Sequence, residues 1–175
     1  MKAIKFFALF VAITALVACN KGVDPKEVEA MKTENASWQA KLAEIQQANS
    51  NLQADYDAMK KDFGMKLGEK GIEKMMKADS TAMATKDAEV NGVVTEHTDL
   101  VNAFSTFLTE NDTWLNELAN NKTTTEEAKK IWAEKQAKGA EFVAKNDEIA
   151  QKWAGWKTTF ETWAAENVTK FAGKK

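Results

Sequence analysis

His97 is the only histidine in the 175-residue chain, and Glu96 and Asp99 flank it. An imidazole close to carboxylates is a common starting point for acid–base or nucleophilic catalysis. No serine near it stands in a nucleophile-elbow motif, and a lone imidazole cannot build a catalytic metal site. His97 also keeps the apolar register of Val90 and Phe104. We therefore expect a structural histidine at the edge of a core, and no enzyme.

Five methionines between residues 59 and 83 offer thioether sulfurs, which are ligands for a soft ion such as Cu(I). They are spread over about seven helical turns, and only some of them share a face. Flexible methionine side chains also fill irregular gaps in helical cores. We expect core packing, with no metal and no cofactor, for Met59, Met65, Met75, Met76 and Met83.

Three tryptophans and a phenylalanine follow one another at steps of three and four toward the C-terminal end. Indole rings offer flat apolar faces with a polar edge, which suits stacking on sugars or binding a partner protein. The same spacing is typical of the buried seam of a helix. Core packing is the favoured interpretation, and the stripe also stands as a candidate partner or ligand surface: Trp153, Trp156, Phe160 and Trp163.

The only cysteine, Cys19, stands behind a leader with the layout of an export signal. A short basic region precedes an uncharged apolar run, Phe6 to Val17. A helix that spans a bilayer takes about 20 apolar residues, and this run is shorter. General signal peptidase needs small residues at −3 and −1, whereas Leu16 is large. We expect residues 1–18 to be a signal peptide that is removed by a peptidase other than general signal peptidase.

The residues Leu16-Val17-Ala18-Cys19 resemble the lipobox of bacterial lipoproteins. The resemblance covers only the signal region. It implies a diacylglycerol on the Cys19 thiol, cleavage between Ala18 and Cys19, acylation of the new amine and a lipid-anchored linker over 19–23. Two or more acyl chains hold a protein stably in a bilayer, at about 0.8 kcal/mol per buried methylene. Asn20 replaces the aspartate that favours inner-membrane retention, so the resemblance points to the outer membrane.

Lysine supplies all 24 basic residues, against 26 acidic ones, and the formal net charge is −2. Loss of Lys2 and Lys5 with the signal would leave 22 lysines and a side-chain charge of −4. Nucleic acid is not expected as a partner of such a surface. The chain has no arginine, whose planar guanidinium is the group best suited to bind phosphates bidentately.

Apolar residues at steps of three and four predict three helices, over about 25–63, 72–118 and 124–172. Asp24 and Pro25 predict the start of the first helix, and a capping box at Thr124 predicts the start of the third. Three glycines within the range 64–71 predict the first turn. Residues 173–175 form a short basic tail.

Asn35 and Asn49 occupy heptad position a in the first helix, where a buried polar residue fixes the register at some cost in stability. Asn146 falls on the inner seam of the third helix. If the first and third helices run parallel, Asn49 and Asn146 lie at about the same height. We therefore expect these two residues to share a polar layer.

Two all-α architectures fit these helices. The favoured one is an elongated up-down-up three-helix bundle over 24–172, because three apolar stripes of similar length can bury one another in one chain. The other is a coiled-coil-like rod in which the first helices of two molecules pair and a separate hairpin follows. That second architecture would make a homo-oligomer through the heptads of the first helix.

The lipobox, the long heptad pattern and the missing catalytic motifs predict a lipid-anchored structural or interaction protein of the cell envelope. It would act as a spacer or scaffold that contacts another envelope protein. An alternative is a ligand-binding or chaperone-like module that uses the tryptophans of the third helix. The chain is also partly similar to the major peptidoglycan-linked lipoprotein of enteric outer membranes. That similarity implies attachment of Lys175 to the cell wall, although Gly173-Lys174-Lys175 replaces the family's tyrosine-arginine-lysine ending.

Overall fold

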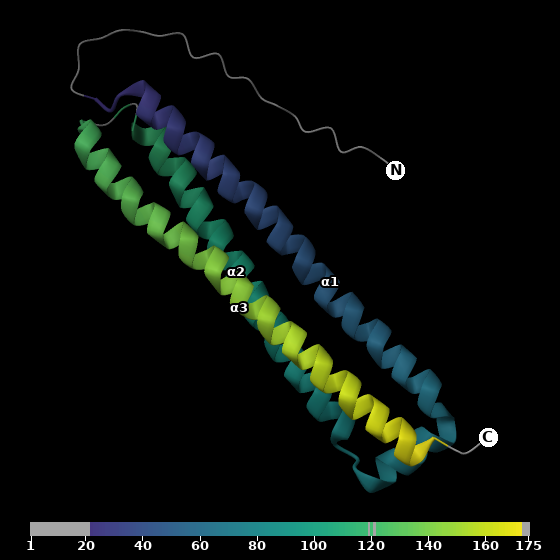
Figure 1. Cartoon of the computed structure of the whole chain (residues 1–175). Helices are drawn as coiled ribbons and strands as arrows, with labels where there is room; N and C mark the ends of the chain where they lie inside the picture. The colour runs from purple at the N-terminus through teal and green to yellow at the C-terminus, as the bar shows by residue number, and fades with distance from the viewer. Residues whose placement is uncertain (1–21, 119, 121, 173–175) are drawn as a thin grey trace, which may run out of the picture.

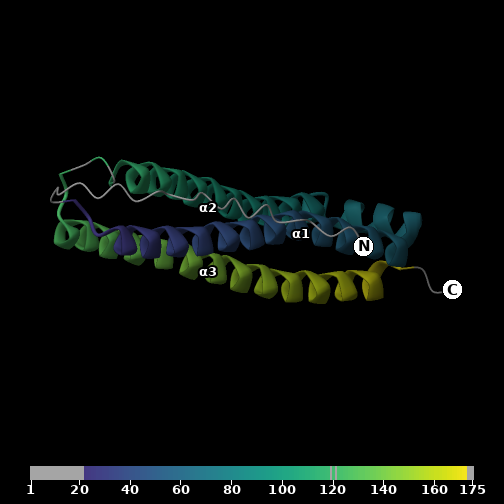
Figure 2. The ribbon, with the colours of Figure 1, turned by 90° about the horizontal axis from the view of Figure 1, so that it is seen from above.

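The computed structural model describes residues 22–118, 120 and 122–172, and the regular structure of these residues is entirely helical. The three helices are α1 (Pro25–Ala78), α2 (Ala82–Leu118) and α3 (Thr125–Phe171). They lie side by side in a rod, with α1 and α3 parallel and α2 antiparallel to both (Figures 1 and 2). The predicted up-down-up bundle is therefore confirmed. The predicted signal peptide, 1–18, and tail, 173–175, lie outside the described residues.

Local signals set the starts of α1 and α3. The Asp24 carboxylate accepts a hydrogen bond from the amide of Lys26 at 2.9 Å, and Pro25 takes a first helical position that needs no donor. Thr124 forms the complete capping box: its hydroxyl accepts from the Glu127 amide at 3.3 Å, and the Glu127 carboxylate accepts from the Thr124 amide at 2.9 Å. Both predicted starts are confirmed.

The predicted turn at residues 64–71 is only partly correct: the backbone is non-helical at Gly68, within this range, but the predicted end of the first helix at 63 and start of the second at 72 are wrong. Helix α1 continues to Ala78, and the true turn is formed by residues 79–81. Asp79 closes it, because its carboxylate accepts from both the amide and the hydroxyl of Thr81, at 2.9 and 2.8 Å. These two bonds lower the pKa of Asp79.

Helix α1 changes direction at Gly68, the only described residue with a positive φ, 68°. Glycine adopts this conformation without the steric cost of a Cβ. The ten residues that follow lie across the end of the bundle (Figures 1 and 2). A Cβ on Gly71 would lie 3.2 Å from the Phe171 carbonyl. The segments before and after Gly68 are helical, and Gly71 in the second segment packs closely against the end of α3.

The core is divided along the rod into three clusters of buried residues. The entry-end cluster, at the start of α1, contains Met31, Leu115, Leu118, Ala128 and Trp132. The middle cluster contains Leu42, Ile45, Leu100, Phe104, Leu108 and Ile149. The turn-end cluster, nearest the α1–α2 turn, contains Leu52, Tyr56, Phe63, Leu67, Met75, Val90, Trp153 and Phe160. Each cluster takes residues from all three helices, so the heptad stripe of α1 is buried within its own chain.

Candidate functional site

The lipobox residues Leu16 to Cys19 lie outside the described residues, but the structure shows where the chain enters the bundle. The Asp24 amide donates to the Thr125 hydroxyl at 3.0 Å, and Lys129 pairs with Glu27 at 2.8 Å. The start of α1 therefore lies beside the start of α3, at the end opposite the α1–α2 turn (Figure 1). Among the described helices, none combines the length and the apolar character needed to cross a bilayer.

The aromatic stripe of α3 faces into the bundle. Trp153 and Phe160 are 9% and 2% exposed, and Trp156 and Trp163 are partly buried against the same cluster. Trp156 stacks on Trp153 and on Phe160, with ring centroids 5.1 Å apart in both pairs. Its indole nitrogen donates to Glu89 at 3.0 Å. These positions agree with core packing of the stripe.

A groove of about 500 Å³ lies between α1 and α3 in the half of the rod nearest the turn. Met59 and Phe63 line it from α1, and Ala164 and Val168 line it from α3. Of the four aromatic residues predicted as a ligand surface, only Phe160 contributes to it. Asp62, Lys66, Glu161 and Thr169 also line it, so the groove combines apolar and charged walls.

Between the entry-end and middle clusters, the three helices meet in a buried polar layer. Asn111 of α2, which has no exposed surface, donates to Asn35 Oδ1 at 3.1 Å. Its own Oδ1 accepts from Lys135 Nζ at 2.8 Å, and Asn35 donates to Asp112 at 2.6 Å. Burial lowers the pKa of Lys135. The predicted burial of Asn35 is confirmed, and this Asn35 layer joins all three helices in one register.

A second polar layer, the His97 layer, lies between the middle and turn-end clusters and contains His97, Asn146, Asn49 and Thr98. His97 Nε2 is 3.2 Å from Asn146 Oδ1, and Asn49 Nδ2 donates to the Thr98 hydroxyl at 3.3 Å. Asn49 and Asn146 thus lie at one level, as predicted, and each contacts α2. His97 is 2% exposed, as expected for a structural histidine. Its burial lowers its pKa, and the contact with Asn146 opposes this shift.

A third polar contact borders the turn-end cluster. The buried Tyr56 hydroxyl donates to Asp87 Oδ1, and Lys60 Nζ donates to the same oxygen at 2.6 Å. The bonds from Lys60 and Tyr56 lower the pKa of Asp87. Burial, followed by the contact with Asp87, raises the pKa of Tyr56. The phenol therefore stays protonated and acts as a structural donor.

The methionines divide into two groups. Met75 is 2% exposed and belongs to the turn-end cluster, against which Met59 and Met83 also pack. Core packing is confirmed for these three. It is wrong for Met65 and Met76, which are 67% and 39% exposed. In the described part of the chain no group of three or more histidine, cysteine or acidic residues is placed to hold a metal ion.

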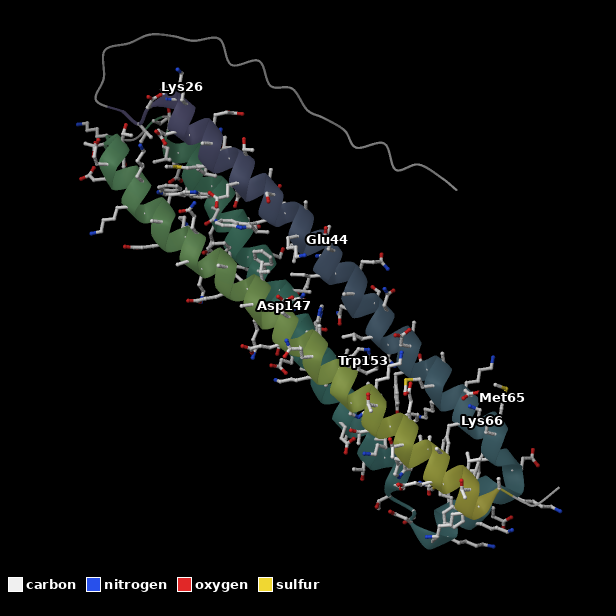
Figure 3. All side chains as sticks on the ribbon, viewed as in Figure 1. Lys26, Glu44, Met65, Lys66, Asp147 and Trp153 are labelled. Carbon is white, nitrogen blue, oxygen red and sulfur yellow. The ribbon has the colours of Figure 1, made fainter. Side chains whose placement is uncertain are left out.

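Among the residues that the structure describes, the large apolar side chains that remain exposed lie at the turn end of the rod. Ile72, at 38% exposure, joins Met65 and Met76 in the last part of α1. Met65 projects from the outer side of α1, away from α3 (Figure 3). Single exposed apolar residues are common, but these three fall within one short stretch. The turn end therefore carries a group of large exposed apolar side chains.

Asn111 and Lys135 were not expected from the sequence. Asn111 stands at helical spacing between Leu108 and Leu115, within the predicted apolar stripe. A polar residue at an apolar position of the helical pattern could therefore have indicated that Asn111 is buried, as it did for Asn35. Lys135 gave a weaker signal, because a long lysine side chain on a helix is more often solvent-exposed.

Comparisons of the chain with protein-family models, with curated proteins and with solved structures give no match.

Proposed function

We propose that the protein is a lipid-anchored spacer or scaffold of the cell envelope, held to a membrane by acyl chains on Cys19. The outer membrane is the proposed location, because Asn20 rather than aspartate follows the cysteine. The observation that carries the proposal is the direction of the bundle. The chain enters at one end of the rod, and the large exposed apolar side chains of the described residues lie at the other.

The length of the rod sets the distance that such a spacer would bridge. Helix α3 has 47 residues, which corresponds to about 70 Å at 1.5 Å per residue. The packing of α3 against α1 and α2 along the rod supports a stiff body of about this length. A partner at the turn end would therefore sit tens of ångströms from the anchored membrane.

The anchor is tested by feeding radiolabelled palmitate to cells that make the wild-type chain or Cys19→Ala. The wild type should take up label and sediment with membranes, and the variant should do neither. Cys19 is the only cysteine, so the substitution leaves no second thiol for acylation. Label in the variant, or none in the wild type, contradicts the lipid anchor.

The proposed partner is an envelope protein that contacts the turn end. A photo-crosslinking amino acid at Met65 should capture it in cells, whereas the same group at exposed Glu44, in the middle of α1, should not (Figure 3). Lys26, at the entry end, serves as a second control. Equal capture from all three positions would contradict a partner site at the turn end.

A second candidate function, binding of an apolar ligand, is favoured by the groove between α1 and α3. Filling it with Ala164→Phe should abolish the fluorescence of a bound apolar dye such as ANS while the helical content stays constant. Unchanged dye fluorescence would contradict ligand binding at this groove.

Attachment of Lys175 to the cell wall is a third candidate, and it requires that α3 end away from the membrane anchor. Helix α3 does end at the turn end of the rod. Mass spectrometry of muropeptides would detect the adduct on Lys175, and its absence would eliminate this candidate.

A further inference from the structure

The polar layers of the bundle differ in how completely they are hydrogen-bonded. In the described residues, the buried side-chain atoms without a partner are Asn49 Oδ1 and His97 Nδ1, and both belong to the His97 layer. In the Asn35 layer, both amide groups of Asn35 and Asn111 have partners. Buried polar groups are nearly always satisfied, so an incomplete layer in the middle of a rod requires a physical explanation.

The bond with Asn146 fixes which nitrogen of His97 carries the proton. An amide oxygen can only accept, so Nε2–H donates to Asn146 Oδ1, and Nδ1 holds the unpartnered lone pair. In this neutral form Nδ1 has no donor facing it, and neither has Asn49 Oδ1. Protonation at Nδ1 would bury a positive charge on the imidazole and would leave a buried N–H donor at Nδ1 without an acceptor.

We infer that the His97 layer makes the bundle acid-sensitive at its middle: protonation of the imidazole loosens the packing of α3 against α1 and α2. This inference is independent of the lipid anchor and of the proposed partner. A cleft of about 250 Å³ over the layer, lined by Ile149 and Trp153 from α3 and by Leu52 from α1, provides the site where water would enter.

The charged groups around His97 do not compensate a proton on its ring. On α1, Asp55 lines the same cleft, but its side chain is exposed and lies 4.0 Å from Lys157 of α3. On α2, Glu96 is held by two lysines of α3, at 3.1 and 2.8 Å. Asp99 of α2 and Asp147 of α3 are exposed. Burial accordingly lowers the pKa of His97.

The direction of the effect on stability follows from that lowered pKa. The unfolded chain, with an ordinary histidine pKa of about 6.5, binds the proton more readily than the folded chain. Neutral His97 therefore makes its full contribution to folding stability above about pH 6.5. This contribution decreases as the pH falls from about 6.5 toward the pKa of the folded chain. For each pKa unit by which the folded value lies below the unfolded value, complete protonation lowers the folding equilibrium constant tenfold.

Because His97 is the only histidine, its ring signals in the full chain can be assigned without ambiguity. We expect ¹⁵N NMR of histidine-labelled full chain in detergent micelles to show a pKa below 6.5 and a neutral Nε2–H tautomer. A pKa at or above 6.5, or the Nδ1–H tautomer, would overturn the inference. This measurement needs no variant and is unaffected by any folding defect.

A variant tests the link to stability. His97→Gln cannot be protonated, and its amide can still donate to Asn146. Lowering the pH from 7.5 to 5 should reduce the urea midpoint of the wild type more than that of the variant, while Asp99→Asn should behave like the wild type. Equal decreases in His97→Gln and the wild type would overturn the inference.

The position of the effect can be measured separately by amide hydrogen exchange in the wild type. After correction for intrinsic exchange rates, acid should increase exchange around residues 93–101 more than around 108–118, which flank the Asn35 layer. A uniform increase along α2 would overturn the assignment of acid sensitivity to the His97 layer.

Discussion

Lys135 Nζ donates a hydrogen bond of 2.8 Å to Oδ1 of Asn111, an amide with no exposed surface. The ammonium also lies over the rings of Phe107 and Trp114, 5.9 and 5.4 Å from their centroids. These contacts replace part of the hydration that the charge loses on burial. A lysine therefore completes the layer that Asn35 begins on another helix.

Asn111→Ala should destabilise the protein by about 1–3 kcal/mol, because it leaves Asn35 Oδ1 and Lys135 Nζ without their buried partner. Asn102→Ala, at an exposed position of the same helix, should change stability by less than about 0.5 kcal/mol. Urea denaturation followed by tryptophan fluorescence measures both. Similar losses in the two variants would contradict the role given to the layer.

Acid should weaken the contact between α1 and α2 at Asp87. Its folded pKa is lowered, so its contribution to stability is present above the unfolded pKa, about 3.9, and is lost as the pH falls through the folded value. Asp87→Asn should therefore lose less stability than the wild type between pH 5 and pH 2. Asp99→Asn, at an exposed position, is the control. Urea denaturation at each pH measures the stability, and equal losses in Asp87→Asn and the wild type would contradict the prediction.

Gly139→Ala should destabilise the bundle, because the new Cβ would lie 2.7 Å from Cζ2 of Trp38. The indole is stacked on Trp132 and cannot move freely, so overpacking should cost about 1–3 kcal/mol. Gly155→Ala on the same helix meets nothing within 4 Å and should stabilise by up to about 1 kcal/mol. Thermal unfolding distinguishes these opposite signs, and a stabilised Gly139→Ala would disprove the close contact.

Gly68→Ala should cost about 1–3 kcal/mol, because a Cβ is disfavoured at φ 68° and ψ 166°, a backbone conformation that is essentially confined to glycine. Gly64→Ala provides the matched control, since Gly64 is helical and a Cβ there meets no atom within 4 Å. The control should be neutral or stabilising. If calorimetry found the two variants equally stable, the change of direction at Gly68 would be in doubt.

The helix starts and the apolar seams could be predicted because they depend on neighbours in the sequence. Asp24 and Thr124 cap helices with groups within three residues, and Asn35 is marked by its place in a heptad. The same logic correctly placed α3 parallel to α1. It also placed Asn49 and Asn146 at one level.

The glycines mark the break at Gly68, but the end of α1 could not be placed correctly because tertiary contacts decide it. Glycine propensity favoured an end near Gly64, yet Met75 is buried in the turn-end cluster and Gly71 packs against the end of α3. Likewise, the sequence shows that Asn35 is buried but not that Lys135, a hundred residues later, reaches its partner Asn111. Such pairings depend on how three helices align, which periodicity along one helix does not specify.

The parallel arrangement of α1 and α3 also has a mechanical consequence. A pull between the point where the chain enters, at Asp24, and the end of α3, at Phe171, would act along the helix axes. All the side-chain contacts between α1 and α3 would then have to break at the same time for the helices to slide past each other. They could not separate one after another. Such shear geometry suits a protein that must bear tension between two attachments.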